Sequence, residues 1–283
     1  MKNFVLKKTN EGELIGYLWP VDAPCCVVCL VHGIGEHAGR YDRMAGFFHE
    51  KNIALVSMDL RGHGKSMGKR GDCSPRSAVR EDVSALIDYA KKTYPGVPVV
   101  LYGHSMGGNI VLDYRSQGEY NGALTAYVVS APWITLVNKP SKPLYQVVKL
   151  LSKIMPKTQI TSPVEEADLG NPISVGAYKA DPLVHDKITA RCAVEGFEIG
   201  EKLHLGCNED NGRAKNIPML LMHGDADKIC SVEGSRALAA AEGELCQYLQ
   251  WEGYFHEIHN GGGSHDGTEV ILATIDFLLA VSA

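Results

Sequence analysis

The chain has 283 residues, of which 45% are hydrophobic, so it can bury one large core, and α/β domains of this size commonly carry an insertion. The net charge is -5 and the pI is near 6.1, and lysine and arginine gather only in short pairs, so nothing indicates a nucleic-acid partner. No window approaches the roughly 18 apolar residues that a membrane-spanning helix needs.

The cysteines and the N-terminus bear on metal binding and on location. The chain has eight cysteines, but the C-x-x-C pair formed by Cys26 and Cys29 has no second pair and no histidines at zinc-finger spacing. We therefore expect no metal and no cofactor. The first eight residues contain no apolar stretch before their charges, so a secretory signal is not expected. Scattered thiols in such a chain indicate a reducing cytoplasm.

Apolar runs typical of buried strands alternate with amphipathic stretches typical of helices through the first half of the chain. An opening hairpin is predicted over 4–8 and 13–19, strands over 24–31, 53–58, 97–101 and 123–129, and helices over 40–51, 74–94 and from 109 onward. This repeated alternation predicts the α/β class, with a mostly parallel central sheet flanked by helices.

The alternation stops after residue 131 and resumes after 211. One helix with a broad apolar face is expected over 143–155, and the remainder of 132–211 is rich in loops. We predict that 132–211 is an inserted helical cap over the carboxyl edge of the sheet, where open α/β folds bind ligands. The two parts of the core are then 1–131 and 212–283, the second with strands over 219–222 and 246–251 and helices over 232–241 and 269–279.

A Gly-x-Ser-x-Gly pattern centred on Ser105 lies between the strand at 97–101 and the helix that follows it. A strand that turns at once into a helix forces its corner residue into a strained conformation, and the flanking glycines let the two elements approach closely. The Ser105 hydroxyl is therefore expected at the carboxyl edge of the sheet, beside a positive helix N-terminus. The pattern alone also fits a serine that only caps a helix, so the rest of the chain must decide.

A serine nucleophile needs a histidine to take its proton and a carboxylate to orient that histidine. Where a strand-to-helix corner carries the serine, the acid and the histidine follow it in the chain, each in a loop past a strand. The loop after the strand at 219–222 offers two acids, Asp225 and Asp227. Asp227 is favoured because it lies farther past the strand end, and Asp225 is expected to hydrogen-bond loop amides.

The loop after the strand at 246–251 supplies the candidate base. His256 is favoured over His259 and His265. His259 begins a glycine-rich run and His265 precedes the last helix, and we expect both to be exposed loop histidines.

A tetrahedral intermediate needs two backbone N–H donors. Met106 follows the serine directly, and Ile34 lies between two glycines in the loop after the strand at 24–31, so these two amides are the candidates. Four further polar residues of these loops are expected to support them by hydrogen bonds: His32, Glu36, His37 and His104.

Four motifs in order carry a specific resemblance. They are HGIGEH at 32–37, GHSMGG at 103–108, HGDAD at 223–227 and EGYFH at 252–256, with RGHGKS at 61–66 between the first two. This set resembles the monoacylglycerol lipase and lysophospholipase branch of the serine α/β-hydrolases over nearly the whole chain outside the cap. The resemblance implies the triad Ser105, Asp227 and His256, with the oxyanion amides of Ile34 and Met106.

The resemblance also implies an activity. We expect hydrolysis of a carboxylic ester, a monoacylglycerol or lysophospholipid-type single-chain ester, through an acyl-enzyme on Ser105. Two alternatives use the same residues: a carboxylesterase of small non-lipid esters and an acyltransferase. The apolar face at 143–155 fits an acyl-chain channel and allows transient contact with a membrane surface, although it could equally pack on the domain. The sequence gives no indication of the oligomeric state.

Overall fold

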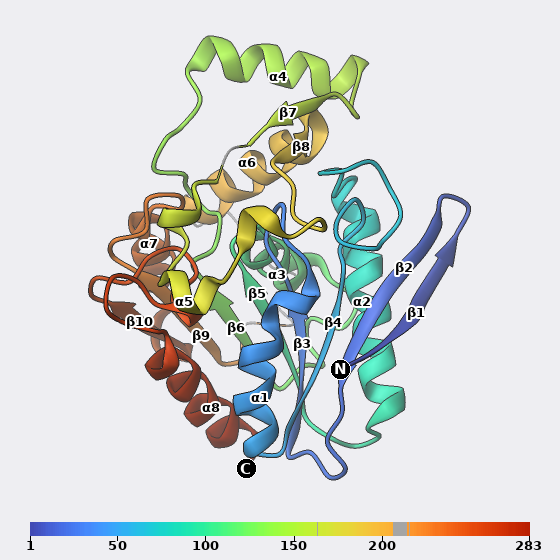
Figure 1. Cartoon of the computed structure of the whole chain (residues 1–283), viewed down its shortest axis with the longest axis vertical. Coiled ribbons are helices and arrows are strands. Elements are labelled where there is room, and N and C mark those ends of the chain that lie inside the picture. The colour runs from blue at the N-terminus through green and yellow to red at the C-terminus, as the bar shows by residue number, and fades with distance from the viewer. Residues whose placement is uncertain (163, 206–213, 215) are drawn as a thin grey trace.

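The structure, a computed structural model, describes residues 1–162, 164–205, 214 and 216–283, and it is built on one eight-stranded sheet (Figure 1). The strand order is β1-β2-β4-β3-β5-β6-β9-β10, with bounds β1 Lys2–Thr9, β2 Gly12–Trp19, β3 Cys26–Val31, β4 Ile53–Met58, β5 Val99–His104, β6 Ala126–Ser130, β9 Met219–Gly224 and β10 Cys246–Trp251. The β1–β2 hairpin joins β4 in antiparallel fashion, and every pairing from β4 to β10 is parallel. The predicted mostly parallel sheet is confirmed.

Helices cover both faces of this sheet. The buried side chains of α1 (Asp42–Glu50) and α8 (Thr268–Ser282) join one core layer, and those of α2 (Arg76–Thr93), α3 (Met106–Gln117) and α7 (Val232–Glu242) join the other. All six residues of β3 are buried, and alternate side chains enter alternate layers. Burial on both faces explains why the central strands read as continuous apolar runs in the sequence.

The chain between β6 and β9 forms a separate group of elements at one end of the sheet (Figure 1). They are α4 (Lys142–Ile154), β7 (Gln159–Thr161), α5 (Pro172–Val175), β8 (Lys187–Thr189) and α6 (Ala190–His204), with short 3-10 turns at Glu166–Asp168 and Tyr178–Ala180. Backbone bonds from His185 to Gly35 and from Glu257 to Leu169 tie this group to the loops after β3 and β10. The boundary predicted between 211 and 212 lies outside the described residues.

Within the described part of the chain, no helix has the length and apolar character required to cross a membrane.

Helix α6 was not predicted from the sequence, which indicated loops outside 143–155. Two glycines, Gly196 and Gly200, lower its intrinsic helix propensity. The structure shows what they do: a side chain at Gly200 would overlap the carbonyl oxygen of Ile134, and one at Gly196 would lie 2.7 Å from the Trp133 ring. The glycines let α6 pack directly on the segment that follows β6.

Two glycine-to-alanine substitutions, one in α6 and one in α1, should change the free energy of unfolding in opposite directions. Gly200→Ala should lower the free energy of unfolding by roughly 1–3 kcal/mol, because its methyl group must displace backbone. The control is Gly46→Ala in α1, where a new methyl group meets nothing within 4 Å and helix propensity should raise stability by up to about 1 kcal/mol. Chemical denaturation measures both, and equal stability of the two variants would contradict the packing described for α6.

Candidate active site

Ser105 lies at the corner between β5 and α3. Its backbone angles are φ 56° and ψ -119°, a region that side-chain-bearing residues seldom adopt. A side chain at Gly107 would overlap the carbonyl oxygen of Val31, and one at Gly103 would overlap that of Gly107, so both flanking positions require glycine. Helix α3 begins at Met106, three residues earlier than the sequence pattern predicted, and Ser105 therefore stands directly at its N-terminus.

Three buried side chains form a hydrogen-bonded chain at this corner. Ser105 Oγ lies 2.8 Å from His256 Nε2, and His256 Nδ1 lies 2.7 Å from Asp227 Oδ2. Asp227 comes from the loop after β9, and His256 from the loop after β10. An ionised Asp227 accepts a hydrogen bond from Nδ1–H, which leaves Nε2 without a proton and able to accept the serine proton. The arrangement has the geometry required for general-base activation of a hydroxyl.

The charge of Asp227 is held by several donors. Its Oδ1 accepts the backbone N–H groups of Ile229 and Cys230 at 2.7 and 3.0 Å, and its Oδ2 also lies 3.2 Å from His223 Nε2. Burial works to raise the pKa of Asp227, but the neighbouring His256 and His223 outweigh it and lower the pKa well below its usual value. Asp227 therefore stays ionised across the physiological range.

The same pair acts in the opposite direction on His256. Burial lowers the pKa of this imidazole, but the Asp227 carboxylate, by its charge and its hydrogen bond, raises the pKa overall. The carboxylate thus favours the protonated imidazole that forms when a hydroxyl proton is taken up.

The alternative residues lie elsewhere. Asp225 is exposed and accepts the Gly253 N–H at 2.7 Å, so it bonds a loop amide as expected. His265 is exposed. The expectation for His259 was wrong: it is buried, its ring lies 5.1 Å from Tyr41 and 5.2 Å from His104, and burial lowers its pKa to about 4. The glycines after His259 suggested an exposed loop, but they fold the loop back against the core.

The loop after β3 passes directly beside the serine. A side chain at Gly33 would lie 3.1 Å from Ser105 Cβ, and Ile34 lines the same cavity as Ser105. Met106 is the first residue of α3, where backbone N–H groups have no partner within the helix. His32 supports this loop on both sides, because its Nε2 accepts the Leu60 N–H at 2.9 Å and its Nδ1 lies 2.7 Å from the Gly33 carbonyl.

A cavity of about 440 Å³ opens onto Ser105. Most of its exposed wall surface is apolar, contributed by Ile34, Trp133, Leu136, Val164, Ile188 and Ile229. Polar residues also line it: Asn138, Thr161, Ser162 and Glu165. An ion pair between Asp168 and Lys228, 2.9 Å apart, lies at its polar side. Apolar walls with a few polar groups suit a ligand that combines a hydrocarbon chain with a polar head. Among the residues that the structure describes, no group of three or more potential ligands is placed to hold a metal ion.

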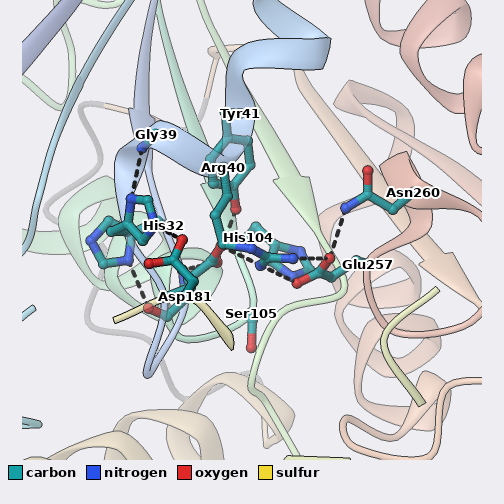
Figure 2. Close-up of polar contacts among 12 residues, drawn as sticks. His32, Gly39, Arg40, Tyr41, His104, Ser105, Asp181, Glu257 and Asn260 are labelled. Atoms are coloured by element: carbon teal, nitrogen blue, oxygen red, sulfur yellow. Dashed lines mark hydrogen bonds and ion pairs between the residues drawn. The ribbon is translucent and has the colours of Figure 1, made fainter. Parts of the chain in front are cut away.

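Sequence reasoning missed two features of the site. His223 contacts Asp227 from behind and also lies 2.7 Å from the Ser235 hydroxyl, a contact between β9 and α7. Arg40 forms buried ion pairs with Glu36 and Glu257, and Figure 2 shows the pair with Glu257. Glu36 also bonds the Gly33 N–H, and Glu257 follows His256 in the chain. The i,i+4 spacing of Glu36 and Arg40 was a usable signal in the sequence. The partner at Glu257 was not, because only the fold brings it within reach.

Comparisons with known proteins identify the family of the chain. The family described as Hydrolase_4, serine aminopeptidase S33, matches residues 22–262. A monoacylglycerol lipase of Mycolicibacterium smegmatis is 35% identical over 246 residues, 86% of this chain and 85% of that protein. A monoglyceride lipase of Homo sapiens is 30% identical, covering 86% and 79%. The crystal structure of a Paleococcus ferrophilus monoacylglycerol lipase superimposes with a TM-score of 0.83 at 29% identity, covering 95% and 99%.

The chain therefore belongs to the α/β-hydrolases, in the monoacylglycerol lipase-like family that its motifs resemble. It is a carboxylic-ester hydrolase.

The pKa shifts predict the pH dependence of this activity. A base must be neutral to accept a proton, so with His256 as the expected base kcat/KM should fall as the pH drops through the pKa of His256. Because that pKa is raised, the midpoint of the fall should lie above the ordinary histidine value of about 6.5.

Asp227→Asn removes the cause of the raised pKa. It should move the midpoint to lower pH and reduce kcat by roughly 10³- to 10⁴-fold. Asp225→Asn is the matched control, and its kcat should stay within about threefold of the value for the parent protein. A pH series of kcat/KM on all three proteins tests this, and equal losses in the two variants would contradict the assignment of Asp227.

Proposed function

We propose that Ser105, His256 and Asp227 form a catalytic triad that hydrolyses single-chain lipid esters of the monoacylglycerol or lysophospholipid type through an acyl-enzyme on Ser105. The observation that carries this proposal is the buried chain from Ser105 Oγ to His256 and on to Asp227, with steps of 2.8 and 2.7 Å.

The reaction follows from these positions. Ser105 Oγ attacks the ester carbonyl carbon while His256 Nε2 takes its proton. The backbone N–H groups of Ile34 and Met106 hold the negative oxygen of the tetrahedral intermediate. The intermediate collapses, the leaving alcohol takes the proton from His256, and the acyl group stays on Ser105. Water then gives a proton to His256 and attacks the acyl-enzyme. As the bond between Ser105 Oγ and the acyl carbon breaks, His256 returns that proton to Oγ, and the fatty acid leaves.

The preference for a lipid ester rests on the cavity and on the relatives. The apolar walls beside Ser105 suit an acyl chain, and the relatives described above are named as monoacylglycerol and monoglyceride lipases. We propose that residues 132–211 act as the cap that selects the acyl chain, because Trp133, Leu136, Val164 and Ile188 of this segment line the cavity.

Replacement of the nucleophile is the first test. Ser105→Ala should reduce the hydrolysis of a monoacylglycerol by about 10³-fold or more and abolish labelling by a fluorophosphonate. The control is Ser77→Ala, because Ser77 is an exposed serine at the start of α2. This variant should keep both the hydrolysis activity and the fluorophosphonate labelling. Normal hydrolysis by Ser105→Ala would refute the mechanism.

The parent protein then discriminates between substrate classes. A higher kcat/KM for long-chain monoacylglycerols than for short soluble esters supports the lipase proposal. The reverse order supports a carboxylesterase, and acyl transfer to added alcohols in preference to water supports an acyltransferase.

The cap also supports a proposal about membranes. Helix α4 exposes an apolar face formed by Leu144, Val147, Leu150 and Ile154, each between 53 and 64% exposed. We propose that this face makes transient contact with a membrane surface, where an insoluble ester resides. We also propose a reducing, cytoplasmic setting, in which the seven described cysteines keep free thiols.

Charged substitution on this face gives a direct test. The pair Leu150→Glu and Ile154→Glu should lower binding to anionic vesicles and the hydrolysis of vesicle-borne monoacylglycerol by about tenfold, because two apolar contacts are lost and two negative charges are added. Hydrolysis of a short soluble ester should be unchanged. The control is Leu272→Glu. Leu272 is 42% exposed on α8, which lies at the opposite end of the molecule from α4 (Figure 1), and this variant should keep both vesicle binding and hydrolysis. Equal loss on both substrates would rule out the membrane role.

A further inference from the structure

Three charged side chains with no role in the proposed steps lie buried beside the triad. Glu36 belongs to the loop after β3, Arg40 to the 3-10 turn Ala38–Tyr41 that follows it, and Glu257 comes directly after His256. Their side chains are only 5, 9 and 3% exposed. Burial of three charges costs free energy unless their partners satisfy them closely, so the contacts of this cluster need an explanation.

Arg40 joins the two carboxylates. Its Nη1 and Nη2 donate to Glu257 Oε1 and Oε2 at 2.5 and 2.9 Å, a bidentate pair. The same Nη1 donates to Glu36 Oε2 at 3.0 Å. The guanidinium also lies 4.6 Å from the centre of the Tyr178 ring, which belongs to the inserted segment. Figure 2 shows Arg40 reaching Glu257 close to His104 and Ser105.

The carboxylates extend these contacts to the loops of the site. Glu36 Oε1 accepts the backbone N–H of Gly33 at 2.6 Å and the Tyr41 hydroxyl at 3.0 Å. Gly33 is the residue before Ile34. On the other side, Glu257 Oε2 accepts the Asn260 side-chain amide at 2.7 Å. One continuous set of bonds therefore runs from the loop that carries Ile34 to the loop that carries His256.

We propose that Glu36, Arg40 and Glu257 are positioning residues for the reaction: they lock the Ile34 loop to the His256 loop, and their one excess negative charge stabilises His256 in its protonated form. This inference rests on the proposed function, which assigns Ile34 and His256 their roles.

The electrostatic part follows from the groups around His256. Its ring contacts Ser105 and His104, from the end of β5 and the corner after it, and Asp227, from the loop after β9. Glu36, from the loop after β3, and Glu257, from its own loop, line the same small cavity as His256, and His259 packs against His104. Burial lowers the pKa of both His104 and His259, so these two are neutral at pH 7. The inserted segment contributes Asp168. The backbone carbonyl of Asp168 accepts the His256 N–H, and the Asp168 side-chain carboxylate pairs with Lys228.

Two carboxylates and one guanidinium thus leave one negative charge in the cluster, in addition to Asp227. After the effects of burial and of Asp227, the charges of Glu257 and Glu36 are the next largest influences on the pKa of His256, and both raise it. A fixed negative charge in a water-poor site favours a cation formed during the reaction more strongly than it would in water.

The test compares acid limbs of kcat/KM against pH. Glu257→Gln keeps the size of the side chain and removes one charge, so the cluster becomes neutral. The pH midpoint of its acid limb should fall by at least about 0.5 pH unit. Its kcat on the pH plateau should fall about tenfold, while KM stays within about twofold of the parent value.

Circular dichroism and thermal melting confirm that each variant is folded. Glu36→Gln should lower the midpoint in the same way, and it replaces Glu257→Gln if that variant does not fold.

A double variant separates charge from mere structural support. Arg40→Met combined with Glu257→Gln leaves Glu36 alone, so the cluster again carries one negative charge, and the midpoint should move back up towards that of the parent. A purely structural role predicts a further loss of rate without this return. Arg43→Met is the matched control: Arg43 is 30% exposed, bonds the His259 carbonyl and Thr268, and should leave the midpoint unchanged.

The outcomes are distinct. A lowered midpoint in Glu257→Gln that rises again in the double variant supports the proposal. An unshifted midpoint in Glu257→Gln and Glu36→Gln, or no return in the double variant, overturns it while Ser105→Ala remains inactive. Full activity of Ser105→Ala would instead overturn the proposed function itself.

Discussion

The close approach of β5, α3 and β3 at the Ser105 corner is the constraint on which the rest of the site depends. Gly103 and Gly107 leave no room for side chains, and Ser105 takes a positive φ as a result. This geometry places the Ser105 hydroxyl at the N-terminus of α3, and Gly33 lies directly beside Ser105. His256, from a loop 151 positions later in the chain, reaches Ser105 Oγ there at 2.8 Å.

Buried charge is the second organising feature. Asp227 is ionised in a nearly water-free position because two backbone N–H groups and two histidines surround it. Arg40 similarly allows Glu36 and Glu257 to be buried next to the loops that flank Ser105. Such clusters cost free energy unless every partner is present, so they contribute to the shape of the site more than to the stability of the fold.

The sequence allowed much of this to be predicted, for identifiable physical reasons. Strands buried on both faces are continuous apolar runs, so β3 and β4 could be recognised directly. Asp227 and His256 were chosen as candidates by chain order and loop position. Helix α6 was missed because its two glycines serve tertiary packing, and His259 was misjudged because glycine-rich neighbours usually mark exposed loops. The Arg40–Glu257 pair spans 217 positions, and no local pattern indicates such a contact.

In the proposed mechanism, the acyl group of the substrate is bound covalently to Ser105 during turnover. Rapid-quench mass spectrometry during turnover of a long-chain monoacylglycerol tests it most directly. The expected result is a transient mass increase equal to one acyl group. Peptide mapping should locate it on the peptide that contains Ser105, and it should be absent from Ser105→Ala. Turnover at the normal rate by a protein in which Ser105 is never acylated, or an adduct on a different residue, would contradict it.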